Sequence, residues 1–203
     1  IERVRGDVRD IASLRTAFEG AELVYHLAGI ITITGEQGGL VSAVNADGVR
    51  NAAVAALECG VRRMVHTSSV HALVQEPLDQ PIDETRARVT SPSYPAYDRT
   101  KARGEAEVRK VVEQGLDAVI VHPTGVIGPL DYEPSRMGRV FLKLYQRKMP
   151  ALVPGGRCYA RRCHAHLSQV LDGALTFAVT KDVDVVVKEA DGVGDSALLE
   201  ALE

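Results

Sequence analysis

The 203 residues are enough for one sizeable core, because 45% of them are hydrophobic. The net charge is −3, with basic and acidic side chains interspersed, which argues against a nucleic-acid-binding protein. No apolar run approaches the roughly 18 residues of a membrane span, and three cysteines are too few for a disulfide framework. We therefore expect a cytoplasmic protein that does not bind membranes.

The first part of the chain alternates between apolar runs and helical patterns. Asp10 is placed to cap a helix that starts near Ile11. The apolar run 23–28 ends at a glycine, as a buried parallel strand often does. Residues 41–59 repeat apolar positions every three or four residues and stop at another glycine, which predicts a helix.

The alternation continues through the rest of the chain. Residues 70–93 form a long polar connection with three prolines, which is typical of a functional loop. The alternation predicts an α/β fold with a parallel sheet and helices on both faces. The further elements are expected as strands at 63–67, 118–121 and 183–187, and as helices at about 96–114, 136–148 and 166–179.

Short polar or glycine-containing motifs follow three of the predicted strands. Because the carboxyl ends of parallel strands meet at one edge, where ligands gather, we expect the functional site there. The motifs are Ala28-Gly29, Ser68-Ser69 and Pro123-Thr124-Gly125. Three histidines also end strands, and we expect them to be satisfied core or rim residues: His26, His66 and His122.

Tyr97 and Lys101 are four residues apart near the start of a predicted helix, so both side chains face the same way. The ammonium favours a charged phenol and should lower the pKa of Tyr97, which makes it a usable general acid or base. A hydroxyl from Ser68 or Ser69 can hold the substrate oxygen. Two simpler interpretations stay open: a surface lysine over a half-buried ring, and a strand-end hydroxyl bonded to the backbone.

In this order, the motifs make the chain resemble the extended short-chain dehydrogenase/reductase superfamily over about residues 1–155. The branch that it resembles is that of NAD(P)-dependent epimerase/dehydratases and dihydroflavonol-reductase-like proteins. The last of the matching segments slightly favours a reductase over a sugar epimerase. The segments are Gly6-Asp7-Val8-Arg9-Asp10, His26-Leu27-Ala28-Gly29, Val44-Asn45-Ala46-Asp47-Gly48-Val49-Arg50-Asn51, His66-Thr67-Ser68-Ser69, Tyr97 with Lys101, and His122-Pro123-Thr124-Gly125-Val126-Ile127-Gly128-Pro129.

The resemblance implies a Rossmann-like doubly wound sheet and a catalytic Ser69, Tyr97 and Lys101. Ser69 would bond the substrate oxygen, Tyr97 would transfer its proton, and Lys101 would bind the nicotinamide ribose. NAD or NADP is the expected cofactor and a small molecule the expected substrate. No metal is expected, because the cysteines and histidines within residues 158–166 match no closed zinc spacing. The expected cofactor-binding residues are Asp7, Val8, Leu27, Ala28, Gly29, Asn45, Tyr97, Lys101 and Pro123.

Two departures from the family pattern bear on function. The 203 residues contain no Gly-x-x-Gly-x-x-Gly loop, which in the family brings a pyrophosphate to a helix N-terminus. The resemblance therefore implies that the family's first βαβα segment is missing and that activity is impaired. Residues 156–203 also depart from the family's usual sequence. We divide the chain into a partial dinucleotide-binding Rossmann domain, residues 1–130, and a partial, divergent substrate lobe, residues 131–203.

Two classes of function stay open. The first is an NAD(P)-dependent oxidoreductase or epimerase that acts on a carbonyl or hydroxyl group by Ser-Tyr-Lys acid–base chemistry. The second is a non-catalytic Rossmann-fold remnant or sensor that binds a nucleotide or a partner. A sensor would not need the acid–base pair, which favours the enzyme. Family members often pair through the helix that carries the tyrosine, so the resemblance also implies a homodimer.

Overall fold

The computed structural model describes residues 3–77, 80–124, 136–146 and 148. The chain divides into two units: among the described residues, the first runs to His122 and the second begins at Pro123. The first unit contains the sheet and its helices. The predicted domain boundary after residue 130 lies outside the described residues.

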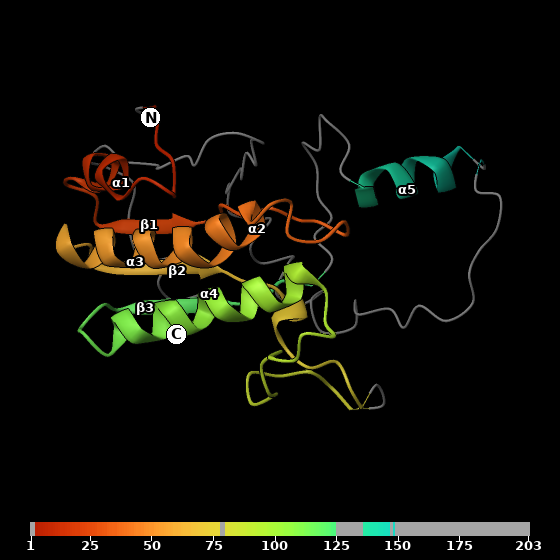
Figure 1. Cartoon of the computed structure of the whole chain (residues 1–203). Helices are drawn as coiled ribbons and strands as arrows, with labels where there is room; N and C mark the ends of the chain where they lie inside the picture. Colours follow the sequence, from red (N-terminus) through yellow and green to blue (C-terminus); the bar gives the residue numbers. More distant parts are fainter. Residues whose placement is uncertain (1–2, 78–79, 125–135, 147, 149–203) are drawn as a thin grey trace. The chain divides into compact units, whose positions relative to one another are not determined.

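Three parallel strands form the sheet of the first unit, in the order β1-β2-β3 (Figure 1). The register pairs His26 with His66 and Thr67 with Val121, so the strands end at the same edge. The parallel α/β arrangement predicted from the sequence is confirmed. The first strand ends two residues earlier than expected, because its ladder with β2 stops at His26. The strands are β1 (Leu23–His26), β2 (Arg63–Thr67) and β3 (Ala118–Val121).

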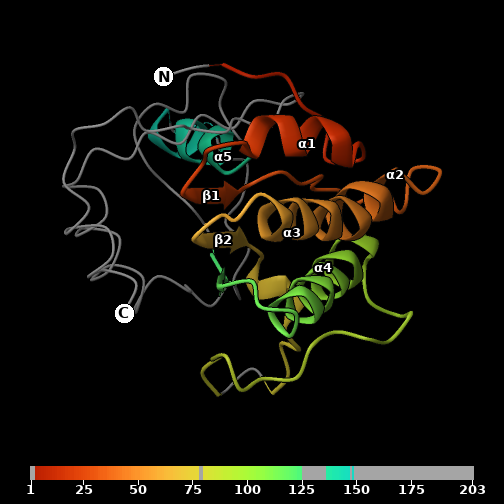
Figure 2. The same ribbon diagram turned by 90° about the vertical axis from the view of Figure 1, so that its left-hand side faces the viewer.

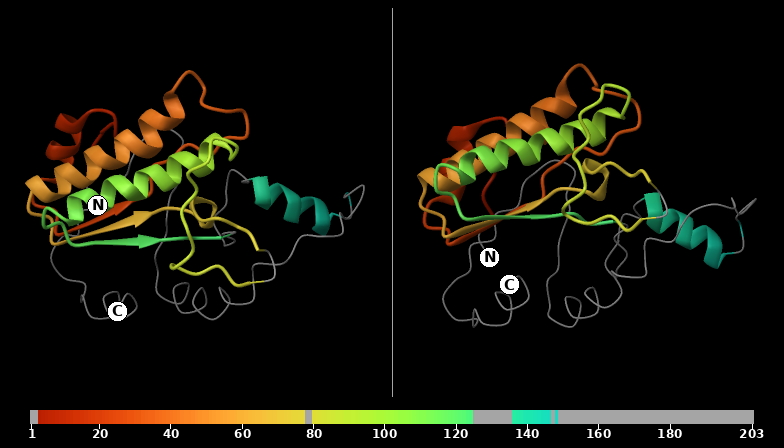
Figure 3. Two further views of the ribbon diagram at one scale, coloured as in Figure 1. Left: turned by 60° about the horizontal axis from the view of Figure 1, so that its bottom comes forward. Right: turned by 90° about the horizontal axis from the view of Figure 1, so that it is seen from below.

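Three helices of the first unit cover one face of the sheet (Figure 3). They are α1 (Ile11–Phe18), α3 (Val49–Glu58) and α4 (Ala96–Val112). α3 lies between α1 and α4 and contacts both (Figure 2). The Asp10 side chain accepts a hydrogen bond from the Ala12 N–H and caps α1, as the sequence predicts. Helices on the second face of the sheet stay a prediction.

Small and branched apolar side chains fill the core between the helices and the sheet. Four alanines of α3 have no exposed surface, which lets this helix lie close to the strands. Burial of apolar surface is the main stabilising contribution in such a core, and here it fixes where the strands end relative to the helices. The alanines pack with Leu14, Phe18, Val24, Met64, Val108 and Val111, among others.

A continuous helical segment takes the place of the single helix predicted over residues 41–59. It begins with α2 (Leu40–Ser42), passes through a π-helical stretch η1 (Ala43–Gly48) and continues as α3. Each hydrogen-bonded loop of a π-helix contains one residue more than in an α-helix. The apolar spacing of residues 41–59 predicts a helix but does not show which of its turns is π-helical. The π stretch carries the buried Asn45.

Gly104 lets α4 lie directly against the π stretch. A Cβ at this position would be 2.4 Å from the backbone oxygen of Asn45, so the backbone would have to move. We expect Gly104→Ala to lower the free energy of unfolding by about 2 kcal/mol through overpacking, although alanine favours an isolated helix. Urea unfolding measures the loss. Gly6→Ala is the matched control, since its Cβ would lie 3.6 Å from the Ser13 hydroxyl; equal losses would contradict the packing role of Gly104.

The described helix of the second unit is α5 (Arg136–Tyr145), which ends three residues before the predicted end at 148. Its Leu142 and Tyr145 side chains are exposed. In the part of the chain that the structure describes, no helix combines the length and the apolar character needed to cross a membrane. The predicted elements at 166–179 and 183–187, and the cysteines and histidines of 158–166, lie outside the described residues.

Candidate active site

The ends of β2 and β3 and the first half of α4 meet at one edge of the sheet. The Ser68 backbone N–H donates to the Val121 carbonyl at 2.9 Å, which holds the two strand ends together. From α4, the Lys101 ammonium donates to the Thr67 carbonyl at 3.0 Å. This helix therefore presents its side chains to the strand ends, where the sequence predicts the site.

Tyr97 lies in the first turn of α4 and contacts Ser69. Partial burial raises the pKa of Tyr97, and a side-chain hydrogen bond with Ser69 opposes the rise without cancelling it. The expected lowering of this pKa by Lys101 is wrong for this structure, because burial raises the pKa and the ammonium donates to the Thr67 carbonyl instead. Tyr97 is therefore a protonated phenol at neutral pH and can donate a proton.

Ser69 follows the end of β2, and its side chain has two partners. Its Oγ accepts from the His71 backbone N–H at 3.2 Å and caps the short 3-10 helix η2 (Val70–Ala72). The same side chain forms the hydrogen bond with Tyr97. The strand-end hydroxyl bonded to the backbone, which the sequence left open, is thus present, and it does not exclude contact with the phenol.

Lys101 is buried beside Gly29, which follows β1. Only 5% of Lys101 is exposed; burial lowers its pKa to about 8, and the charge of Glu105 opposes the fall. Its ammonium carries three N–H groups, and among the described residues it has a hydrogen-bond acceptor in the Thr67 carbonyl. A Cβ on Gly29 would lie 3.2 Å from the ammonium. Gly29 itself is exposed.

Asn45 fastens the segment after β1 to α4. Its Oδ1 accepts from the Ile30 N–H at 2.8 Å, and its Nδ2 donates to the Ile30 carbonyl at 2.9 Å. The same Nδ2 donates to the Thr100 hydroxyl at 3.2 Å. Asn45 has no exposed surface, and its bond to Thr100 is buried, whereas its two bonds to Ile30 are partly buried. In this structure it positions the chain beside Lys101, and its contact with a cofactor stays a prediction.

The other predicted cofactor-binding residues have varied surroundings. The Asp7 carboxylate accepts from the side chain of the arginine two residues later, which lowers the pKa of Asp7. Val8 is a core residue with 4% exposed, and its carbonyl accepts from a side chain of α3. Leu27 and Ala28 are half-buried directly after β1. Pro123 begins the second unit. Cofactor contacts of all five stay predictions.

The buried carboxylate of Glu105 is a feature that the sequence analysis did not identify. Its Oε1 accepts from the Ser68 hydroxyl at 2.6 Å and from His122 Nε2 at 2.8 Å, while its Oε2 accepts from Arg88 Nε at 3.1 Å. Burial alone would raise the pKa of Glu105, but these hydrogen bonds outweigh it and lower the pKa. Its position four residues after Lys101, on the same helix face, is the signal that could have found it.

His26 and His66 face each other across β1 and β2, with their Nδ1 atoms 3.3 Å apart. Each Nε2 is buried without a hydrogen-bond partner among the described residues. The expectation of satisfied histidines is therefore wrong for these two, because the parallel register sets them opposite each other; it is confirmed for His122, which bonds Glu105. Burial lowers the pKa of His26 to about 3 and that of His66 well below its ordinary value. Both rings are neutral at physiological pH.

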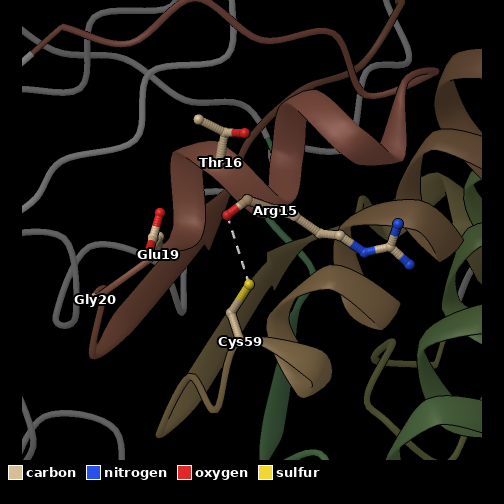
Figure 4. Close-up of a pocket in the computed structure, with 5 residues that line it drawn as sticks. All are labelled: Arg15, Thr16, Glu19, Gly20 and Cys59. Atoms are coloured by element: carbon tan, nitrogen blue, oxygen red, sulfur yellow. Dashed lines mark hydrogen bonds between the residues drawn. The ribbon is translucent and has the colours of Figure 1, made fainter.

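A hollow of about 350 Å³ lies where α1 and α3 end (Figure 4). Gly20 lies three residues before the start of β1, and Cys59 directly follows α3. The hollow is therefore at the edge where the strands begin, opposite the edge of Tyr97, and it is not part of the candidate site. It is lined by Arg15, Thr16, Glu19, Gly20 and Cys59.

A nicotinamide dinucleotide fits this edge at its ribose end. Lys101 has donor hydrogens beyond the one on the Thr67 carbonyl, and it lies beside a glycine where a side chain would crowd it. Such a group can hold ribose hydroxyls. The fit cannot be extended to the pyrophosphate with these 203 residues, because they contain no Gly-x-x-Gly-x-x-Gly loop.

Comparison with known proteins settles the family. The model described as the NAD dependent epimerase/dehydratase family matches residues 1–188. The chain belongs to this family. The membership confirms the predicted Rossmann-like α/β fold and a family of nicotinamide-dependent enzymes. It also confirms, at the level of the family, the expected class of cofactor.

Two curated relatives support the membership in the epimerase/dehydratase family. Sterol demethylase protein B of Methylococcus capsulatus is 39% identical over 157 residues, which are 76% of this chain and 47% of the relative. A Synechocystis protein named "Putative dihydroflavonol 4-reductase" is 32% identical over 156 residues, 77% of this chain and 45% of the relative. The predicted likeness to dihydroflavonol-reductase-like proteins is thereby confirmed. The chain spans about half the length of these relatives.

A solved structure shows the same fold. The crystal structure of gox2253 aligns with a TM-score of 0.63 and 34% sequence identity, covering 72% of this chain and 45% of that one. The Rossmann-like sheet of the epimerase/dehydratase family is thus common to both, although each comparison covers only part of the longer chain.

Proposed function

We propose that the chain carries the acid–base residues of an NAD(P)-dependent oxidoreductase or epimerase that acts on a carbonyl or hydroxyl group of a small molecule. The observation that carries the proposal is the anchoring of the buried Lys101 to the end of β2, two residues before Ser69, with Tyr97 one helical turn earlier on the same face of α4. A reductase is preferred to a sugar epimerase, in keeping with a relative named for a dihydroflavonol 4-reductase.

The chemistry at the substrate follows from the placement of three side chains. The Ser69 hydroxyl bonds the substrate oxygen and holds it beside the Tyr97 phenol. During reduction, Tyr97 gives its proton to this oxygen, and in the reverse reaction it takes the proton back. Lys101 would hold the ribose of the dinucleotide with the ammonium hydrogens that the Thr67 carbonyl does not use. When bound, the dinucleotide supplies or accepts the hydride. Because the pKa of Tyr97 is raised, its proton-donating form is the resting one, which suits carbonyl reduction.

Lys101→Met is expected to weaken dinucleotide binding about tenfold or more, because a hydrogen bond to a charged group contributes roughly 1.5–3 kcal/mol. Titration of NADH and NADPH fluorescence measures both dissociation constants. Weak binding is expected even before substitution, since the 203 residues lack the glycine loop, so the titration extends to millimolar dinucleotide.

The matched control for this substitution is Lys110→Met. Lys110 lies on the same helix in an exposed ion pair with Glu107, and its loss should leave binding unchanged. Urea unfolding of both variants separates binding from stability. Equal affinity in Lys101→Met and the original protein would remove Lys101 from the cofactor site.

A non-catalytic sensor that binds a nucleotide or a partner is the second candidate. The two functions differ in whether NADH or NADPH is consumed with a carbonyl compound. The names of the relatives make sterol ketones and dihydroflavonols the first compounds to assay. Binding without turnover over such a panel would favour the sensor. A homodimer and a cytoplasmic location stay predictions.

A further inference from the structure

We propose that Glu105 is a positioning residue for the Ser69–Tyr97 pair, an inference that rests on the proposed function. It acts through Ser68, which precedes Ser69 in the chain and donates its hydroxyl proton to Glu105 Oε1 at 2.6 Å. Glu105 has no exposed surface and Ser68 has 3%. This bond fixes the chain just after β2 to the middle of α4, away from water.

The bond belongs to a set of contacts along one face of α4. Glu105 lies four residues after Lys101, so the two side chains project from the same face on successive turns. Lys101 bonds the Thr67 carbonyl, and Glu105 bonds the Ser68 hydroxyl. Two consecutive residues at the end of β2 are thus held by two consecutive turns of one helix. Ser69 is the next residue of the chain, so these two anchors set where it lies relative to the helix.

Two further donors keep the Glu105 carboxylate in place. His122 Nε2, just after β3, lies 2.8 Å from the oxygen that Ser68 also bonds, and Arg88 Nε lies 3.1 Å from the other oxygen. Arg88 belongs to the long connection between β2 and α4, where it pairs with Leu73 in an antiparallel bridge. The carboxylate cannot turn away from Ser68 without losing these two partly buried donors while its own oxygens stay buried, which is costly in a medium of low dielectric constant.

A carboxylate that only stabilises the fold would leave turnover per folded molecule unchanged. Stabilisation of the fold and positioning of Ser69 depend on different hydrogen bonds of Glu105. Stability depends on all the donors that surround Glu105, whereas the position of Ser69 depends on the bond to Ser68. Substitutions that break one bond and keep another therefore distinguish positioning from stability.

The first test is a set of kcat measurements. Glu105→Leu breaks the bond to Ser68 and should lower kcat about tenfold, with little change in KM. Ser68→Ala should give a similar loss, and the double variant should lose no more, because both substitutions remove the same bond. Glu105→Gln should restore kcat to within about twofold of the original, since its amide oxygen still accepts from Ser68, although its amide N–H₂ facing Arg88 lowers stability. Glu107→Leu is the matched control, because this carboxylate of α4 bonds Lys110 and not Ser68.

The second test does not need turnover. The bond with Ser69 opposes the rise in the pKa of Tyr97, so loss of positioning should raise this pKa further. NMR titration of ring-labelled tyrosine, assigned with Tyr97→Phe, should show the rise in Glu105→Leu and Ser68→Ala but not in Glu107→Leu. An unchanged Tyr97 titration, or kcat losses that add in the double variant, would overturn the proposal. If Tyr97→Phe keeps full turnover, the proposed function fails instead, and the titration still decides the role of Glu105.

Discussion

Tyr97→Phe is expected to lower turnover about a hundredfold or more while leaving dinucleotide binding almost unchanged. The phenol proton is the one that the proposed reaction transfers, and a positioned acid contributes roughly 10²–10⁴-fold to the rate. Phenylalanine keeps the partly buried ring and removes only the oxygen that contacts Ser69. The rate of NADH or NADPH consumption measures turnover, and fluorescence titration measures binding.

Tyr94→Phe is the matched control for this substitution. Tyr94 lies three residues earlier, and its hydroxyl reaches the Glu76 carboxylate at 3.5 Å, so its loss should leave turnover intact. Ser69→Ala should lower turnover about tenfold, the effect of one hydrogen bond. A Tyr97→Phe protein that turns over within tenfold of the original would exclude Tyr97 as the proton donor.

The protein is expected to lose about 3 kcal/mol or more of its free energy of unfolding between pH 6.5 and pH 4.5. In the unfolded chain a histidine takes up a proton near pH 6.5, whereas folded His26 does so only near pH 3. Between these values the unfolded state binds more protons, so stability falls as the pH falls, by about 1.4 kcal/mol per pH unit for each such residue. His66 adds to the loss, because its pKa is also well below the ordinary value.

Urea unfolding at several pH values measures this loss, and the range above pH 4.5 keeps it apart from the protonation of Glu105. His26→Gln should lessen the dependence, because glutamine does not titrate and only the contribution of His66 remains. His71→Gln should keep it, since the His71 side chain is 57% exposed. If the free energy of unfolding stays constant from pH 6.5 to 4.5, His26 and His66 take up protons as readily in the folded state as in the unfolded state.

The strands and α4 could be predicted from the sequence because their signals are local. The apolar runs that end near Gly29 and Ser68 indicate strands without reference to the elements that pack against them. The spacing of Tyr97 and Lys101 puts both on one helix face. The edge at which Ser69 lies followed from a general property of parallel sheets, whose strand ends share an edge. The roles of these residues stay predictions until variants are measured.

The errors of the sequence analysis come from burial and from contacts distant in sequence. The pKa of Tyr97 depends on how far its ring is desolvated, and no residue pattern gives that quantity. His26 and His66 are 40 residues apart, so only the strand register shows that they share one buried space. The network of Glu105 joins three segments of the chain, and only its spacing from Lys101 is visible in the sequence.

The π-helical stretch η1 constrains the number of residues in this part of the chain as well as their types. Removing one residue from a helix turns every later side chain by about 100° around the axis. A deletion within Ala43–Gly48 would therefore take Asn45 away from Ile30 and put another residue beneath Gly104. Substitution of the half-exposed Asp47 does not change the direction in which the later side chains of the helix project. Homologous chains should thus align without gaps here while differing in residues, and insertions should gather at exposed positions such as 83–85.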